Sequence, residues 1–163
     1  MNHWQNRIFC LFLHRALCMS FLSLFASVLF LVNGCGLNPI PAPNVISGSN
    51  NLSAPKNGNA TFIFEHNGEL YGSFQLKAYL TVPASVLQTP QGGGIQKSSD
   101  NLNVAPESGY GVSEECGYYY YYMITDVEPH YAKVFIHSTT QDDDSIAIDF
   151  NWWLQTQAGE RNF

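Results

Sequence analysis

Residues 70–82 place the strongest constraint on the fold, because apolar or small residues alternate there with polar or amphipathic ones. The segment LYGSFQLKAYLTV has an apolar or small residue at every second position, from Leu70 to Val82. A period of two predicts a β-strand that packs one face on a hydrophobic core. Pro83 follows directly and has no backbone donor, so we expect the strand to end there.

Four other segments have the composition or the alternation of strands. Residues 61–65 form a short apolar run, and Asn67-Gly68 after them is typical of a two-residue hairpin turn, because both positions tolerate positive φ. The others are residues 118–125, 131–138 and 145–155. Since no segment after the N-terminal region has a helical period, we predict an all-β fold: a small antiparallel β-sandwich or open barrel of at least five strands.

One long stretch between these strands has no clear pattern. Residues 88–115 are rich in glycine, serine, asparagine and glutamine, and we expect a loop there. Loops longer than about 15 residues are unusual in compact domains and are functional or disordered where they occur. The sequence favours neither of these alternatives.

The N-terminal region has the parts of a secretory signal. Residues 16–32 are apolar and uncharged, Arg7 and Arg15 precede them, and no acidic residue occurs among the first 34. The apolar run ends in Val32-Asn33-Gly34-Cys35, which resembles the lipobox of bacterial lipoproteins. The resemblance implies that residues 1–34 form a signal helix that is removed, and that Cys35 then carries a diacylglyceryl anchor.

Two alternatives to lipoprotein processing remain for this region. The 17 apolar residues are at the short limit for a membrane span, so an uncleaved anchor is one of them. An ordinary signal cleaved near Gly34 is the other. All three place residues 36–163 outside the cytoplasm. The lipoprotein resemblance implies attachment to the cell membrane or outer membrane, with the domain facing the periplasm or the exterior, and Gly36 after the cysteine favours the outer membrane.

The remainder of the chain is expected to hold a tether and one domain. Residues 35–59 are rich in proline, asparagine, serine and glycine, which predicts a flexible tether after the lipidated Cys35. Residues 60–163 should form the all-β domain. Without the signal, the chain has 13 acidic and 5 basic residues, a formal charge of −8. This charge argues against a nucleic acid partner, which requires a basic surface.

Five consecutive tyrosines, Tyr118 to Tyr122, are the most unusual feature of the expected domain. On a strand, Tyr119 and Tyr121 share one face, and the other three tyrosines share the opposite face. One set can enter the core, while the other lies under a loop or remains exposed. We predict that Tyr119 and Tyr121, extended by Trp153 or Trp152, form a binding strip for a glycan or an envelope protein. The alternative is that these tyrosines only cover the sheet, since tyrosine has a high strand propensity.

Neither a catalytic site nor a metal or cofactor site is predicted. None of the common hydrolase, zinc-protease or phosphate-loop motifs occurs. The spacing of Cys116, His130 and His137 matches no standard zinc motif, and residues 142–144 favour a solvated turn over a calcium site. After loss of the signal and acylation of Cys35, Cys116 is the one remaining thiol, so no internal disulfide is expected.

The function predicted from these features is a membrane-anchored envelope lipoprotein with a non-catalytic binding domain. A structural subunit of an envelope or secretion assembly is the main alternative, with an edge strand of the domain pairing with neighbouring subunits. A hydrolase with an unfamiliar site is a lesser alternative.

Overall fold

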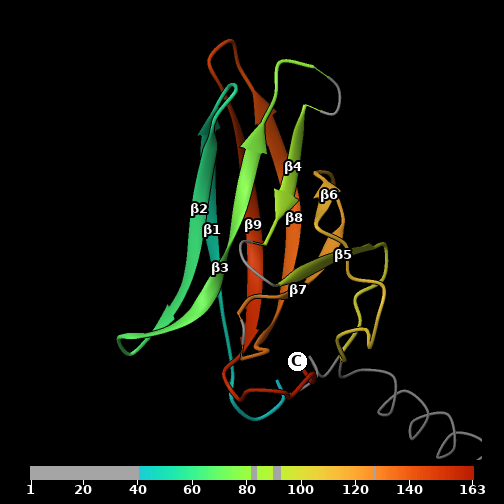
Figure 1. Cartoon of the computed structure of the whole chain (residues 1–163). Coiled ribbons are helices and arrows are strands. Elements are labelled where there is room, and N and C mark those ends of the chain that lie inside the picture. The colour runs from blue at the N-terminus through green and yellow to red at the C-terminus, as the bar shows by residue number, and fades with distance from the viewer. Residues whose placement is uncertain (1–40, 82–83, 90–92, 127) are drawn as a thin grey trace, which may run out of the picture. The chain divides into compact units, whose positions relative to one another are not determined.

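The computed structural model describes residues 41–81, 84–89, 93–126 and 128–163, which form two antiparallel β-sheets (Figure 1). One sheet has the strand order β1-β9-β8-β7-β5, and the other has the order β2-β3-β4-β6. The bounds are β1 (Val45–Pro55), β2 (Asn59–His66), β3 (Glu69–Ala78), β4 (Ser85–Gln88), β5 (Gly94–Ser98), β6 (Ser113–Glu115), β7 (Tyr120–Ile124), β8 (Tyr131–Gln141) and β9 (Ser145–Gln155). The predicted all-β fold is confirmed, as two sheets that do not close into a barrel.

The core lies between the two sheets and contains a cluster of aromatic rings. Phe62, Phe64 and Phe74 come from the four-stranded sheet, whereas Phe150 and Trp152 come from β9 of the five-stranded sheet. Their contacts join ring centroids that are 5.1–5.9 Å apart. Each such pair adds about 0.5–1.5 kcal/mol beyond the burial of its area. The cluster therefore holds the sheets face to face.

The prediction of a flexible tether is wrong for residues 45–55, which form the edge strand β1. This strand pairs with β9 from Val45 opposite Gln155 to Pro55 opposite Ser145, without a register shift. Ile46, Leu52 and Ala54 pack in or against the core, and Ala54 is fully buried. The sheet domain therefore begins before Ala60. The expected signal helix and Cys35 lie outside the described residues.

The alternation along β3 is interrupted at Gly72. Phe64 of β2 faces two residues of β3, Tyr71 and Gly72, in a β-bulge, and Gly72 has a φ of +93°. The extra residue moves every earlier side chain of β3 to the opposite face. As a result Tyr71 is buried and Leu70 is 66% exposed, although the alternation predicts the reverse.

The prediction of a long loop at residues 88–115 is wrong in part, because two short strands lie within it. Residues 94–98 form β5, which pairs with β7, and residues 113–115 form β6, which pairs with β4. Both strands lie at an edge of their sheet. The predicted Asn67-Gly68 turn is confirmed, with φ values of +53° and +83°.

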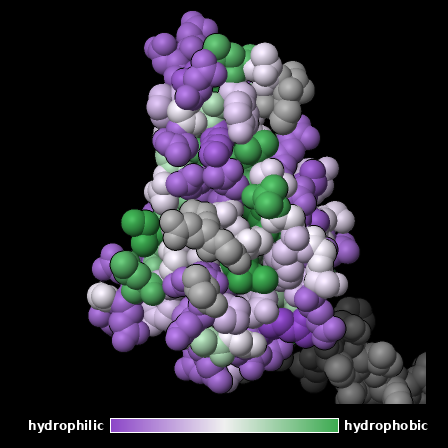
Figure 2. Space-filling model, viewed as in Figure 1, coloured by the Kyte–Doolittle hydropathy of each residue, from purple (hydrophilic) through white to green (hydrophobic). Residues whose placement is uncertain are grey.

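The four-stranded sheet lies nearer the viewer in Figure 1, and Figure 2 shows the same side of the molecule. This side is mainly hydrophilic, and its hydrophobic residues are scattered rather than joined in one patch. Ile63, Leu70 and Leu80 are among the exposed apolar side chains. In the part of the chain that the structure describes, there is no helix that is long and apolar enough to cross a membrane.

Candidate functional site

The five tyrosines are distributed between the core and the outer face of the five-stranded sheet. Tyr121 points into the core and is fully buried. Its hydroxyl donates to the backbone carbonyl oxygens of Glu115 (2.8 Å) and Gly117 (3.3 Å), and burial raises its pKa. The prediction that Tyr121 contacts a ligand is therefore wrong, because the two sheets enclose its ring.

Tyr122 belongs to the outer face but is covered by a segment of the predicted loop. Its hydroxyl donates to the carbonyl oxygen of Asp100 (2.9 Å) and accepts a hydrogen bond from the backbone N–H of Leu102 (2.6 Å). The ring is fully buried, and burial raises the pKa of Tyr122 to about 12. Residues 100–102 therefore cover this part of the sheet.

Lys133 of β8 lies beside Tyr122 and binds the same covering segment. Its ammonium donates to Asn101 Oδ1 (3.1 Å) and to the carbonyl oxygen of Leu102 (3.2 Å). The rings of Trp153 and Phe163 have their centroids 4.8 and 5.0 Å from the same nitrogen. Burial lowers the pKa of Lys133 to about 8, because the charged form loses solvation there.

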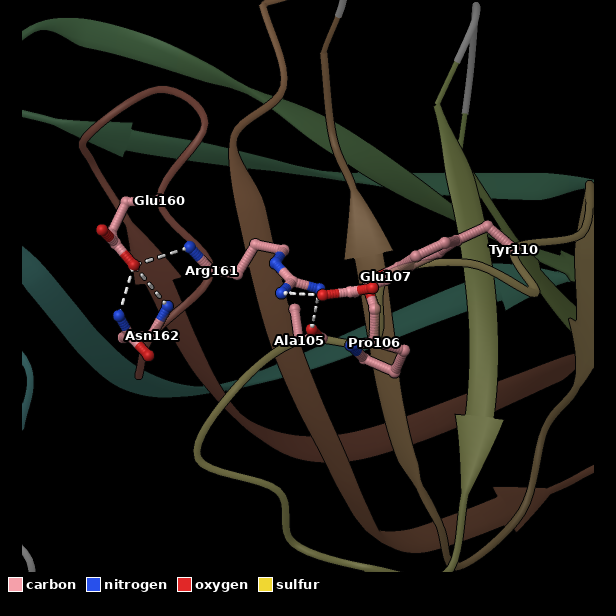
Figure 3. A network of polar contacts seen from close by, with 7 residues as sticks. All are labelled: Ala105, Pro106, Glu107, Tyr110, Glu160, Arg161 and Asn162. Atoms are coloured by element: carbon pink, nitrogen blue, oxygen red, sulfur yellow. Dashed lines mark hydrogen bonds and ion pairs between the residues drawn. The ribbon is translucent and has the colours of Figure 1, made fainter.

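The C-terminal residues complete the cover by pairing with residues 103–105. The N–H of Ala105 donates to the carbonyl oxygen of Arg161, and the N–H of Phe163 donates to that of Asn103, each over 2.8 Å. The Arg161 guanidinium reaches back to the carbonyl oxygen of Ala105 (3.1 Å) and to the Glu107 carboxylate (2.9 Å), as Figure 3 shows. These contacts close one end of the outer face.

The other end of the outer face carries an open cluster of aromatic side chains, the aromatic patch, formed by Tyr118, Tyr120 and Phe135. Tyr120 and Phe135 are paired across β7 and β8, and their rings stack with centroids 4.5 Å apart and planes at 24°. Tyr118 meets Phe135 edge-on at 4.9 Å and is 70% exposed. Tyr118 is therefore the exposed ring of the patch, whereas Tyr120 and Phe135 are half-buried and cover each other.

Polar side chains extend from the aromatic patch across the remaining strands. Asn151 of β9 is paired with Phe135 on one side and with Ser49 of β1 on the other. The Ser49 hydroxyl donates to Asn151 Oδ1 (2.7 Å), and two residues along β1, in the next pair on the same face, Asn51 donates to the Asp149 carboxylate (2.8 Å). At about 4.8 Å between strands, the row from Ser49 to Tyr120 is roughly 14 Å wide.

A cleft of about 350 Å³ opens beside the aromatic patch. It forms where β8 continues past its last pair with β7, between residues 136–139 and the segment that leads from β6 to β7. Its lining comprises Cys116, Gly117, Tyr118, Ile136, His137, Ser138 and Thr139. Its volume is near the lower limit for small-ligand pockets. Tyr118 belongs to both the patch and the cleft.

Only one of the three predicted contact residues shares the face of the aromatic patch. Trp153 lies on it, half-buried at the border of the covered end. Tyr119 does not, because its ring turns toward Lys97, whose ammonium is 5.1 Å from the ring centroid. The alternation in residues 131–138 already places Phe135 opposite the apolar face of β8. Nothing in the sequence pairs Phe135 with Tyr120.

The described residues contain no group of three or more histidine, cysteine or acidic side chains that could hold a metal ion. Cys116 is half-buried, and burial raises the pKa of its thiol to about 11. The Asp142 carboxylate accepts hydrogen bonds from the N–H groups of Asp144 (2.8 Å) and Ser145 (2.6 Å), which lower its pKa. Asp142 thus stabilises the turn between β8 and β9.

Comparison of the chain with known protein families, with curated proteins and with solved structures found no match.

Proposed function

We propose that this chain is a lipid-anchored envelope protein whose β-sandwich binds its partner non-catalytically through the aromatic patch and the cleft beside it. The observation that carries the proposal is the exposure of Tyr118, beside the stacked rings of Tyr120 and Phe135, at the end of the outer face that residues 100–105 and 161–163 leave open. The partner is an envelope protein or a glycan.

Solvent-exposed aromatic rings on a rigid sheet are well suited to binding. Tyr118 offers a flat apolar face and a hydroxyl, and it loses little side-chain entropy when it is covered. Tyr120 and Phe135 are already fixed by their stacking, so a partner need not order them. The scattered apolar residues on the other sheet have no such arrangement.

The anchor rests on the resemblance of residues 32–35 to a lipobox. Only nine residues separate Cys35 from Val45, where β1 begins. Ten peptide steps span at most about 35 Å when fully extended. A lipid on Cys35 would therefore hold the β-sandwich close to the membrane surface, nearer than a tether of residues 35–59 would.

Intact mass spectrometry of the membrane-extracted protein tests the anchor. We expect the chain to lack residues 1–34 and to carry a lipid mass, and we expect neither change in a Cys35→Ala variant. A full-length chain without lipid in both preparations would rule out lipoprotein processing and favour the uncleaved anchor.

Sedimentation with isolated cell envelopes tests the binding face. The wild-type protein, solubilised in detergent, should co-sediment with envelope fragments of its source organism, and Tyr118→Ala should weaken this binding at least tenfold. Tyr79→Ala is the matched control, because Tyr79 is 40% exposed and lies outside the aromatic patch. Equal binding by all three proteins would exclude the patch as the contact surface.

One observation favours the alternative of a structural subunit. Strand β1 is 11 residues long and contains no charged side chain, and in the described sheets it pairs on one side only, with β9. Such an edge is open to pairing with another strand. Size-exclusion chromatography after cross-linking should give oligomers that Ser53→Lys abolishes, and a monomer at all concentrations would exclude this alternative.

A further inference from the structure

We infer that the open edge of β1 pairs with β1 of a second copy of this chain, antiparallel and in a register that is symmetric about Asn50. The inference rests on the structural-subunit alternative of the proposed function, for which it names the partner strand, and it is independent of the aromatic patch. The composition of the edge, the direction of its backbone groups and their symmetry support it.

Strand β1 lacks the features that protect the other described edge strands from pairing. Strand β2 carries Glu65, β5 carries Lys97, and β6 is three residues long. Short edges and charged side chains discourage pairing with another chain. Strand β1 has 11 residues without a charge, and its proline, Pro55, lies at the last position. The edge before Pro55 is therefore open to another strand.

The backbone of β1 directs its odd-numbered residues toward the open edge. At one end of the strand, the N–H of Thr156 donates to the carbonyl oxygen of Asn44. At the other end, the N–H of Lys56 donates to that of Asp144, and the register has no shift in between. The even-numbered residues therefore make the hydrogen bonds to β9, and the residues between them point their N–H and C=O groups outward. Within β1 the outward residues are Val45, Ser47, Ser49, Asn51, Ser53 and Pro55.

The outward groups that have no partner are arranged symmetrically. The N–H of Val45 already donates to the carbonyl oxygen of Ala42 (3.2 Å). Pro55 has no N–H, and its carbonyl oxygen accepts from the N–H of Gly58 (2.8 Å). In the part of the chain that the structure describes, no hydrogen bond reaches the backbone of the other four, which are exposed and lie at equal intervals on either side of Asn50. These four are Ser47, Ser49, Asn51 and Ser53.

A second copy of β1, turned about a two-fold axis at Asn50, is complementary to this edge without any change of shape. Ser47 lies opposite Ser53 of the second copy, and Ser49 lies opposite its Asn51. Four residue pairs result, and each exchanges two hydrogen bonds. Because both copies use the same residues, the contact closes as a dimer and leaves no open β1 edge.

The dimer would also bring two aromatic patches together on one surface. The two five-stranded sheets would join through β1 into one sheet, with both patches on the same face. Five strand spacings separate the two Phe135 residues, roughly 24 Å in all. A partner with repeated sites would engage both patches at once, which strengthens binding without new contacts.

Charge pairs across the dimer test the register in the detergent-solubilised full chain. Native mass spectrometry over a dilution series should show a wild-type dimer at micromolar concentrations. Ser47→Lys together with Ser53→Lys places like charges opposite each other and should raise the dimer Kd at least tenfold. Ser47→Glu together with Ser53→Lys places opposite charges there and should keep the Kd within about threefold of the wild type. Within one copy the two positions are exposed and about 20 Å apart, so both variants should be equally stable.

The outcomes separate the inference from the alternative on which it rests. If neither double variant forms dimers, β1 pairs in another register, so the inference is wrong and the alternative survives. If both variants form dimers as the wild type does, or if the wild type is a monomer at all concentrations, both are wrong. The proposed binding face is unaffected by each of these results, because it is measured separately with cell envelopes.

Disulfide trapping tests the same register independently. The two Asn50 residues would face each other as a non-hydrogen-bonded pair with Cα atoms about 4.5 Å apart, which is within the range of a disulfide. The two Ser53 residues would be about 20 Å apart. Asn50→Cys should therefore give more oxidised dimer than the parent chain, and Ser53→Cys should not. Equal trapping of the two variants would overturn the register.

Discussion

Substitution of two tyrosines from the same run should have opposite effects on stability and on binding. Tyr121 is fully buried between the sheets, whereas Tyr118 is 70% exposed at the cleft. We expect Tyr121→Ala to destabilise the domain strongly and Tyr118→Ala to leave its stability unchanged. The pair therefore tests how the structure divides Tyr118 to Tyr122 between core and surface.

The size of the effect follows from what each ring contacts. Replacing a buried aromatic residue by alanine costs about 3–5 kcal/mol. Tyr121→Ala also leaves the carbonyl oxygens of Glu115 and Gly117 without this donor, which adds about 1 kcal/mol or more. Since domains of this size are stable by about 5–15 kcal/mol, the loss is a large fraction of the total. Substitution of an exposed residue such as Tyr118 changes stability by about 0.5 kcal/mol at most.

Urea unfolding monitored by tryptophan fluorescence measures both variants, because Trp152 lies in the aromatic core. In thermal unfolding followed by the same fluorescence, the melting temperature of Tyr121→Ala should be lower by about 15 °C or more, at about 4 °C for each kcal/mol lost. Tyr121→Phe keeps the ring and should lose only about 1–2 kcal/mol, which separates the hydroxyl from the packing. A loss below 1 kcal/mol for Tyr121→Ala would refute its placement in the core.

Three other predictions concern single positions. Gly72→Ala should lower the free energy of unfolding by more than about 3 kcal/mol, because the added Cβ would lie 2.1 Å from the Thr125 carbonyl oxygen at a φ of +93°. Gly68→Ala also has a positive φ but has open space around it, so it should lower the free energy of unfolding by about 1 kcal/mol. Equal losses for the two variants in urea unfolding would contradict this. Burial lowers the pKa of Lys133 to about 8 in the folded protein, so between pH 8 and 10 the unfolded chain binds a proton at this residue that the folded protein has released. The free energy of unfolding of the wild type should therefore rise by about 2 kcal/mol from pH 8 to pH 10, relative to that of Lys133→Met. Parallel pH profiles of the two proteins would refute the burial of this ammonium. Burial raises the pKa of the Cys116 thiol to about 11, so little reactive thiolate is present at pH 8. The thiol should therefore react with a disulfide reagent far more slowly in the native protein than in urea. Equal rates would show that the thiol is accessible in the native protein.

The strands that alternate clearly are the ones that the sequence predicts. Residues 131–138 and 145–155 correspond to β8 and β9, and the Asn67-Gly68 turn joins β2 to β3. The alternation in residues 70–82 holds only for Phe74, Leu76 and Ala78, because the bulge at Gly72 reverses the faces before it. A bulge depends on pairing with another strand, which a pattern within one strand does not report.

Strand β1 could not be predicted because its composition resembles that of a linker. Ile46, Leu52 and Ala54 face the core at alternate positions, but Gly48 and Asn50 interrupt the apolar series between them. At Gly48 a Cβ would lie 2.9 Å from the Trp152 ring, so close packing requires a glycine there. This contact joins residues that are far apart in the sequence, and alternation alone gives no signal for it.

The sequence predicts where aromatic side chains gather, but not which of them lie together on the outer face. The sequence indicates an aromatic binding surface at residues 118–122, and the aromatic patch includes Tyr118 and Tyr120 from that run. It does not indicate which set enters the core, because Met123 and Ile124 continue the two faces with equally apolar residues. Phe135 joins the patch only through the pairing of β7 with β8.

Hydroxyl-radical footprinting of the protein in intact envelopes is the most direct test of the aromatic patch as a binding face. Oxidation of Tyr118 and Phe135 should be several-fold lower in envelopes than in the detergent-solubilised protein, while oxidation of Tyr79 stays the same. Equal oxidation of Tyr118 in both preparations would show that nothing covers the patch where the protein resides, and would contradict the proposed function.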